Sequence, residues 1–315
     1  MGRPCKSLDE VVFDILQIVD GDKASSHRDD GAEYFFRGEE RRYNIPGRPD
    51  TAFDPVLDRE EAFWKHEREL YEEAMRLNVA SFSEDRTMCE RISRMQHYRL
   101  PTRFADLSVN ALLPALFACG GCSDKPGGYP DEEGVIRVFK VAKHKMKSFT
   151  SDIIMAISHL PLVNADDIHL GNGNQQDVGY LAYEIQRERP NFSLDSCGRR
   201  GRTLYEEIQQ VQVWAFKPMM NNPRIRNQGG LFLAFGCRDG KEPLHPTFSH
   251  ADYSNPDAAS YGIEQVGSVR IAASAKETIL KQLRMFGMTE ESVYPDLQNV
   301  CQALDKRFKE LYPNK

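Results

Sequence analysis

The sequence predicts an α+β protein with a helical layer in its N-terminal part and further helices towards its C-terminus. Two observations support this class: helical patterns come first along the chain, and strand patterns follow, separated by helices and loops. Strands and helices do not alternate regularly, as they would in a doubly wound parallel sheet. No internal repeat, low-complexity tract or linker is visible, so residues 1–315 are expected to form a single domain.

The first half of the chain alternates helix patterns with polar loops. Residues 7–19 carry an apolar stripe that includes Val11 and predict an amphipathic helix capped by Ser7 or Asp9. The run Tyr34–Gly38 predicts a short strand that ends at its glycine. Further helices are predicted at Asp58–Leu77, Ser83–Tyr98 (ended by Pro101) and Asn110–Cys119, with loops at 20–31, 41–56 and 120–134.

The second half carries most of the strand patterns. Strands are predicted at Val135–Val141, Val211–Phe216, Gly229–Phe235 and Val269–Ala272. Helices are predicted at Ser151–Leu160, Leu181–Arg189, Thr203–Gln210, Lys276–Phe286 and Asp296–Leu311. A polar loop at 170–179 and a long irregular insertion at His245–Gly262 separate them.

Composition limits the class of partner. The 315 residues are ample for a buried core, and a formal net charge of −6 gives no overall positive field for nucleic acid or a membrane surface. No apolar stretch approaches the ~20 residues of a membrane-spanning helix, so no membrane partner is expected. Seven scattered cysteines and the lack of a signal-peptide pattern indicate a reducing cytoplasm.

Arg37 is the first candidate functional residue. It follows three aromatic residues and precedes Gly38. An arginine at the end of a strand, beside a flexible turn, is well placed to bind a phosphate or carboxylate with both arms of its guanidinium. The alternative is a structural salt bridge to an acid such as Glu39.

The segment Gln96–Ser108 is the second candidate, because it concentrates polar side chains next to a helix end. Strand alternation would place Thr102, Phe104 and Asp106 on one face and Arg103 on the other. His97 could act as a general base or hydrogen-bond a ligand hydroxyl, and Tyr98 could stack on a ring. The alternative is a structural network in which Asp106 pairs with Arg103 or Arg37.

Arg224 and Gln228 form the third candidate, at a turn where Gly229 and Gly230 permit close approach of a backbone. The alternative is a bulge or tight turn with the arginine in solvent. No metal site is expected, because Cys119 and Cys122 form a lone C-x-x-C pair and the set His245, His250 and Asp252 is more typical of an exposed insertion.

These segments resemble the FRG-domain family of bacterial and phage proteins. The family takes its name from a Phe/Tyr-Arg-Gly motif, here Phe36-Arg37-Gly38. Met95–Ser108, followed by Asn110 and Ala115–Ala118, is similar to the more specific family pattern Gln-His-Tyr-Gly-Leu-Pro-Thr-Arg-Leu-Leu-Asp-Trp-Thr and its following helix. Pro223–Phe232 and the tail Glu277–Leu297 also fit, so the resemblance covers about residues 30–300.

The chain departs from that family pattern in two motifs, and the loop after Cys119 and the insertion His245–Gly262 also look specific to this chain. Arg99 stands where the family has a glycine, and Ala105-Asp106-Leu107 replaces Leu-Asp-Trp. The second change puts a stacking role at that position in doubt.

A more distant resemblance is to the ADP-ribosyltransferase superfamily, and it implies a core of mixed or split antiparallel sheet. Arg37 matches the arginine that grips the phosphates or ribose of NAD in that superfamily, and Thr102–Ser108 matches a Ser/Thr segment that precedes a helix under the nicotinamide pocket. A third motif there carries a glutamate that holds a ribose hydroxyl, but this chain has Gln228. Glutamine can hydrogen-bond the hydroxyl but cannot withdraw a proton.

The resemblance implies a site of named residues. Arg37, His97 and Gln228 would be catalytic. NAD would be the substrate, held by Arg37, Gly38, Gln96, Tyr98, Thr102, Arg103, Asp106, Ser108 and Arg224. The expected partners are a macromolecular acceptor, protein or nucleic acid, and an antitoxin or other regulatory protein.

Three functions remain open from the sequence. The first is an NAD-using ADP-ribosyltransferase that acts as a toxin or defence effector. The second is a module that binds nucleotide or nucleic acid through the same arginines without catalysis. The third is an interaction protein in which Gln96, His97 and Asp106 are buried, bonded to one another and remote from any cleft.

Overall fold

The computed structural model describes ten stretches of the chain. They are residues 2–25, 31–43, 47–123, 128–163, 175–193, 213–228, 230–236, 245–256, 258–296 and 299–304. The predicted helix Thr203–Gln210 lies outside them.

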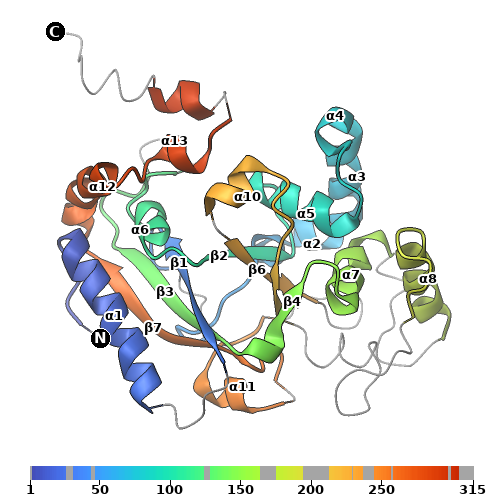
Figure 1. The fold of residues 1–315 in the computed structure, drawn as a ribbon, viewed down its shortest axis with the longest axis horizontal. Coiled ribbons are helices and arrows are strands. Elements are labelled where there is room, and N and C mark those ends of the chain that lie inside the picture. Colours follow the sequence, from blue (N-terminus) through green and yellow to red (C-terminus); the bar gives the residue numbers. More distant parts are fainter. Residues whose placement is uncertain are drawn as a thin grey trace.

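A seven-stranded sheet, mostly antiparallel, forms the centre of the fold (Figure 1). Its strand order is β4-β5-β6-β2-β1-β3-β7, and β4 and β5 are its parallel pair. The strands are β1 Glu33–Glu39, β2 Phe104–Ser108, β3 Gly134–Val141, β4 Met146–Ser148, β5 Val213–Lys217, β6 Gly230–Phe235 and β7 Ile263–Ile271. The α+β class expected from the sequence is therefore confirmed, with a mixed sheet.

The sheet is nearly divided between β1 and β2. Strands β1 and β3 pair along seven positions, from Glu33 to Glu39, whereas β1 and β2 share the single register pair Phe36 opposite Ser108. An antiparallel ladder continued from this pair would place Gly38 opposite Asp106. The two fully described strands separate there instead, which opens the middle of the sheet.

Two groups of helices cover one face of the sheet, on either side of this division (Figure 1). The first group packs over β1, β3 and β7 and comprises α1 Leu8–Ser25, α6 Leu112–Ala118 and α12 Lys276–Met285. The second group packs over β2, β5 and β6 and includes α3 Glu67–Leu77, α5 Met88–His97, α7 Asp152–His159 and α8 Gln175–Gln186. Alternation along β1 sends Phe36 into the first group's core and Phe35 to the opposite face.

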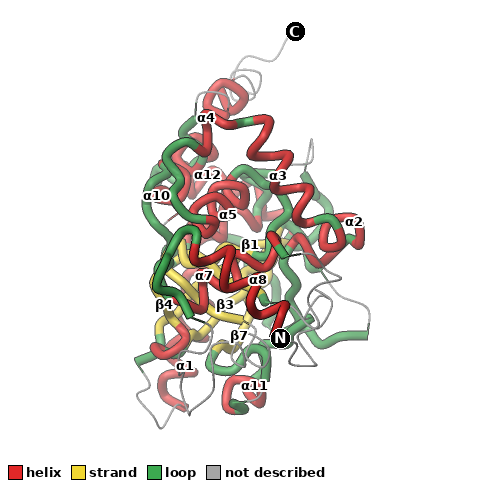
Figure 2. Tube along the Cα trace, turned by 90° about the vertical axis from the view of Figure 1, so that its right-hand side faces the viewer, coloured by secondary structure: helices red, strands yellow, loops and turns green. Residues whose placement is uncertain are grey.

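The opposite face is covered by segments with little regular structure. Phe53 and Phe248 pack there against Phe35, Phe139 and Phe235 of the sheet. Figures 1 and 2 place the short helix α11 His250–Ser254 at one end of the molecule, far from α3 and α4 Val79–Phe82. The insertion 245–262 is thus irregular apart from α11 in its described part, as expected.

Several predicted helix bounds were wrong. The predicted helix Asp58–Leu77 is broken at Glu60 and at His66, into η1 Val56–Arg59, α2 Glu61–Lys65 and α3. The break at His66 places Glu67 inside the protein, where it pairs with Arg103. The helix predicted from Ser83 begins at Met88, because the Thr87 hydroxyl accepts a hydrogen bond from the Glu90 N–H and caps it there.

The other bounds are closer to prediction. α1, β1, β3, α6, α7 and α12 lie within a few residues of the predicted elements, although α1 extends to Ser25, into the predicted loop. α8 begins at Gln175, within the polar loop predicted at 170–179, and β7 begins six residues before the predicted Val269. Near the C-terminus, α13 Glu290–Val293 was not predicted, and helix resumes at residues 299–304. No helix in the described stretches is long and apolar enough to cross a membrane.

Candidate functional site

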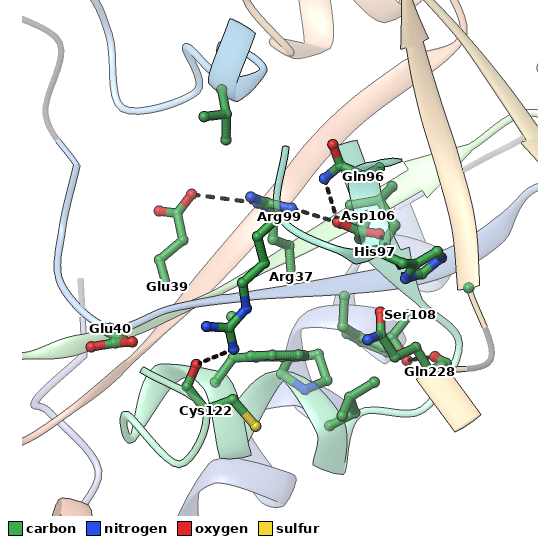
Figure 3. A pocket seen from close by; sticks show the side chains of 18 of the residues that line it. Arg37, Glu39, Glu40, Gln96, His97, Arg99, Asp106, Ser108, Cys122 and Gln228 are labelled. Atoms are coloured by element: carbon green, nitrogen blue, oxygen red, sulfur yellow. Dashed lines mark hydrogen bonds and ion pairs between the residues drawn. The ribbon is translucent and has the colours of Figure 1, made fainter. Parts of the chain in front are cut away.

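A cleft of about 290 Å³ opens where β1 and β2 separate (Figure 3). Its size is at the lower end for small-molecule sites, which are roughly 300–1,000 Å³. Residues from β1, the end of α5, β2, α6 and α10 Pro223–Gln228 line it, together with Tyr294. The cleft brings together seven of the residues that the sequence singled out: Arg37, Gly38, Gln96, His97, Asp106, Ser108 and Gln228.

Arg37 lies in the wall of the cleft. Its Nη1 donates a hydrogen bond of 2.9 Å to the main-chain oxygen of Asp106, and its Nε lies 3.7 Å from a Glu39 oxygen. The guanidinium carbon is 4.8 Å from the centre of the Phe53 ring, a cation–π distance. The predicted salt bridge to Glu39 is therefore loose, and Glu39 bonds more closely to Arg137, at 3.0 Å.

Gly38 permits α6 to lie directly on β1. A Cβ atom placed on Gly38 would be 1.9 Å from the main-chain oxygen of Pro114 in α6, which no side chain can tolerate. Gly134 of β3 has the same relationship to Ala118, at 2.2 Å. The glycine of the Phe-Arg-Gly motif is thus required by packing, which brings α6 to the edge of the cleft.

Asp106 is held by a chain of side-chain hydrogen bonds. The Thr102 hydroxyl donates to the Gln96 carbonyl at 2.5 Å, and the Gln96 amide donates to Asp106 Oδ2 at 2.7 Å. The Thr102 bond orients the Gln96 amide, which therefore presents its NH₂ group to the carboxylate. The Asp106 side chain keeps 35% of its surface exposed and reaches the cleft.

His97 lies beside Asp106 and is only 4% exposed. Its Nδ1 is 3.9 Å from Asp106 Oδ1, and its ring packs 5.1 Å from that of Phe232. Burial lowers the pKa of His97 below its ordinary value, although the Asp106 carboxylate opposes this shift. A neutral imidazole in this position can accept a proton at neutral pH.

Four buried polar atoms of these residues have no hydrogen-bond partner among the described residues. They are Arg37 Nε, both ring nitrogens of His97, and Asp106 Oδ1. Buried polar groups in proteins nearly always have a partner, so a cluster of exceptions around one cavity indicates a place where a ligand or water completes the bonding. An interaction protein with a purely structural network would keep these residues remote from any cleft, and they are not.

Ser108 and Gln228 join β2 to α10 at the base of the cleft. The Ser108 hydroxyl donates to the Gln228 main-chain oxygen at 3.1 Å and accepts from the Asn110 N–H at 3.0 Å. Figure 3 shows the two side chains beside each other.

Four other predicted ligand residues do not line the cleft. Arg103 forms a buried ion pair with Glu67 and also donates to the Phe235 main-chain oxygen, and Thr102 is buried beneath Gln96. Arg224 donates to Asp296 and to the His97 main-chain oxygen, and its guanidinium lies between the rings of Tyr98 and Tyr294. These contacts place Thr102, Arg103, Tyr98 and Arg224 behind the cleft wall, where they support its shape.

The sequence reasoning missed two arginines that line the cleft. Arg59 lies at the end of η1 and lines the cleft. The sequence did not indicate this position, because the pattern around Arg59 predicted a long helix with a solvated face. Arg99 was noted as a departure from the family glycine but was not assigned to the site. Its backbone φ of 68° marks it, because positive φ is uncommon for a residue with a side chain.

The described residues contain no group of three or more His, Cys, Asp or Glu side chains that could hold a metal. Cys119 and Cys122 are buried free thiols, and burial raises the pKa of Cys119 to about 12. His245 and His250 pair separately with Asp54 and Glu264, and Asp252 caps α11.

The family comparison agrees with the motif at β1. The family model of the FRG domain matches residues 32–126. The chain contains an FRG domain. Within the described stretches, the FRG domain match includes β1, α5, β2 and α6, and hence Arg37, Gln96, His97 and Asp106, whereas Gln228 and Tyr294 lie outside it. Comparisons with curated proteins and with solved structures gave no match.

Proposed function

We propose that this chain is an ADP-ribosyltransferase-like enzyme that takes NAD as its substrate and modifies a macromolecule, as a toxin or defence effector does. The observation that carries the proposal is the set of buried polar atoms of Arg37, His97 and Asp106 that make no hydrogen bond within the described residues and lie around one cleft. The mixed sheet, nearly divided at this point, is the kind of core that the superfamily resemblance implies.

Arg37 is suited to the anionic part of NAD. Its Nη1 is fixed by the Asp106 main-chain oxygen, while its Nε is buried without a hydrogen bond. A guanidinium fixed at one end presents its remaining donors in a defined direction, which favours bidentate recognition of phosphate. Binding energy from the phosphates would then orient the rest of the substrate.

Asp106 supplies the carboxylate that Gln228 lacks. Its Oδ2 is held by Gln96, and its Oδ1 remains available beside His97. In ADP-ribosyl transfer the bond between ribose C1′ and the nicotinamide nitrogen breaks, and both electrons leave with nicotinamide. Positive charge then develops on the ribose, and a fixed carboxylate nearby stabilises it.

His97 is suited to the proton that the reaction releases. A nucleophilic oxygen or nitrogen of the acceptor attacks C1′, forms the new bond and must lose its proton. Because burial keeps His97 neutral at neutral pH, its imidazole can take that proton, directly or through one water molecule. The resulting imidazolium would be stabilised by Asp106, 3.9 Å away.

A non-catalytic nucleotide-binding module is the second candidate, and Gln228 favours it. A glutamine at the place of the superfamily glutamate allows binding of a ribose hydroxyl without general-base chemistry. This alternative predicts that NAD or another nucleotide binds through Arg37 and is recovered unchanged.

The deciding experiment incubates the protein with NAD labelled in its adenylate part and a cell lysate. Label is then measured on protein and on RNA, and released nicotinamide is quantified. Arg37→Ala and Asp106→Asn are compared with Arg76→Ala, an exposed arginine of α3 that pairs with Glu73. The proposal expects labelling by the wild type and Arg76→Ala and at least a hundredfold loss in the other two. Full labelling by folded Arg37→Ala, or NAD binding without release of nicotinamide, would reject it.

A further inference from the structure

Arg99 occupies a backbone position that favours glycine. It follows the end of α5, where the Leu100 N–H donates to the Met95 oxygen and the Arg99 N–H donates to the Gln96 oxygen, each at 3.0 Å. This pair of bonds is the Schellman arrangement, whose left-handed residue is usually glycine. Arg99 adopts the left-handed conformation with φ of 68°. A strained backbone conformation of this kind is typical of residues whose side chains have a role at a site.

The Arg99 side chain returns into the cleft. Its Nη2 donates to the main-chain oxygen of Cys122 at 3.1 Å, and its guanidinium carbon lies 4.9 Å from the centre of the Tyr294 ring. Figure 3 shows the guanidinium directed towards Cys122, below β1 in that view. These two contacts fix the position of the guanidinium in the cleft.

Arg59 lines the cleft close to Arg37. Its Nη2 donates to the Asp54 main-chain oxygen at 3.2 Å, and its guanidinium carbon is 5.3 Å from the Tyr43 ring centre. Burial lowers the pKa of Arg59 and the positive charge of Arg37 lowers it further, whereas the nearby carboxylates of Glu39 and Asp54 oppose these shifts. Glu39 is shared with Arg137, so an anion bound in the open part of the cleft would add to the stabilisation of both guanidinium groups.

We propose that the cleft has two anion-binding positions, one formed by Arg37 with Arg59 and one by Arg99. Its ligand would then carry two adjacent anionic groups, as the pyrophosphate of a dinucleotide does. This inference deepens the proposed function and relies on it for the choice of NAD. Arg99 would be the specificity-determining residue, because its guanidinium forms the second of the two positions.

The test uses inorganic pyrophosphate and orthophosphate as probes in calorimetric titrations of the full chain. We expect the wild type to bind pyrophosphate at least about tenfold more tightly than orthophosphate, the effect of one further charge-assisted contact. Arg99→Gly should reduce that preference to about twofold, because only the position formed by Arg37 and Arg59 would remain. Arg99→Lys should retain most of the preference, because it keeps the charge.

The control is Arg68→Gln, which removes the same charge from α3, where Arg68 pairs with Glu72 and does not line the cleft. This variant should leave the preference for pyrophosphate over orthophosphate unchanged. Arg59→Gln should weaken the binding of both anions. Retention of the full preference by folded Arg99→Gly, or no preference in the wild type, overturns the inference.

Turnover of NAD separates this inference from the proposed function. If pyrophosphate preference depends on Arg99 but NAD is not consumed, the two-position cleft is supported and the transferase proposal fails. If NAD is consumed and Arg99→Gly leaves the KM for NAD and the pyrophosphate preference unchanged, the transferase proposal is supported and this inference fails.

Discussion

The Arg37 guanidinium joins the two strands that form the cleft: its Nη1 donates to the Asp106 main-chain oxygen at 2.9 Å across the gap between β1 and β2. In a continuous ladder, that oxygen would accept from a backbone N–H of the neighbouring strand. The strands pair only at Phe36 and Ser108 within their described lengths, so the side chain replaces a backbone donor. The residue proposed to bind the anion therefore also holds the cleft walls together.

Arg37→Met should therefore lower stability as well as ligand affinity. The methionine keeps much of the apolar contact with Phe53 but leaves the Asp106 oxygen without this donor. We expect a loss of about 1–2 kcal/mol in the free energy of unfolding, measured by urea denaturation. Arg76→Met on exposed α3 serves as the control and should change stability little. An unchanged value for Arg37→Met would show that the hydrogen bond does not hold the strands.

Gly38→Ala should be strongly destabilising. The added Cβ would lie 1.9 Å from the Pro114 main-chain oxygen, so α6 must move away from β1. We expect a loss of about 3 kcal/mol in the free energy of unfolding, as in other overpacked sites. Gly21→Ala is the matched control, because Gly21 lies in α1 with nothing within 4 Å of the added Cβ. This change should increase the free energy of unfolding by about 0.5–1 kcal/mol. Equal effects at the two sites would contradict the packing argument.

The elements that the sequence predicted well are those whose side-chain period is set by one continuous apolar face. α1 and α12 are examples, because each packs one apolar stripe against the same core. The helix break at His66 was missed because it depends on a tertiary pairing between Glu67 and Arg103, which lie 36 residues apart and have no local signature.

The site was predictable from the sequence only where local patterns specify it. Local motifs indicated Arg37, Gln96, His97 and Asp106, and strand alternation placed Thr102 and Asp106 on one side. Alternation could not show that Thr102 is covered by Gln96, or that Arg103, on the other face, meets a buried glutamate. Arg59 and Arg99 reach the cleft only through loop conformations, such as the left-handed turn at Arg99, that residue types do not specify.

Arg99→Gly and Arg99→Ala should differ in stability although both remove the same contacts. Each loses the hydrogen bond to Cys122 and the stacking on Tyr294, but only alanine retains a Cβ in the left-handed conformation. We expect the glycine variant to be more stable than the alanine variant by about 1 kcal/mol, measured by thermal or urea unfolding. The same pair of substitutions at Arg76, within α3, should give the reverse order, because glycine weakens a helix.

His97 should make stability depend on pH below neutrality. Burial lowers the pKa of His97 in the folded state, whereas the unfolded chain has the ordinary value of about 6.5. As pH falls from about 6.5 towards the folded pKa, the unfolded state binds more protons and the free energy of unfolding decreases. The measurement is urea denaturation at several values between pH 7 and pH 5.

The variant for this prediction is His97→Gln, which keeps a polar side chain that does not titrate. The decrease in stability over that range should be smaller for His97→Gln than for the wild type, whatever the offset between the two proteins at pH 7. Parallel curves would mean that His97 keeps its ordinary pKa in the folded protein.

Arg103 should affect folding and not ligand selectivity. Arg103 and Glu67 are both almost fully buried and bonded to each other, and neither lines the cleft. Glu67→Gln alone removes one charge of a buried pair, and we expect a loss of about 3–5 kcal/mol in the free energy of unfolding. The double variant Glu67→Leu with Arg103→Leu should recover part of that loss, because it removes both charges of the pair together. The affinity of the folded double variant for pyrophosphate should be within about twofold of the wild-type value. A change of that size is well under the ~1.4 kcal/mol that a tenfold change in affinity represents. A tenfold loss of affinity in that folded variant would instead show that Arg103 contributes to ligand binding, as the family resemblance implies.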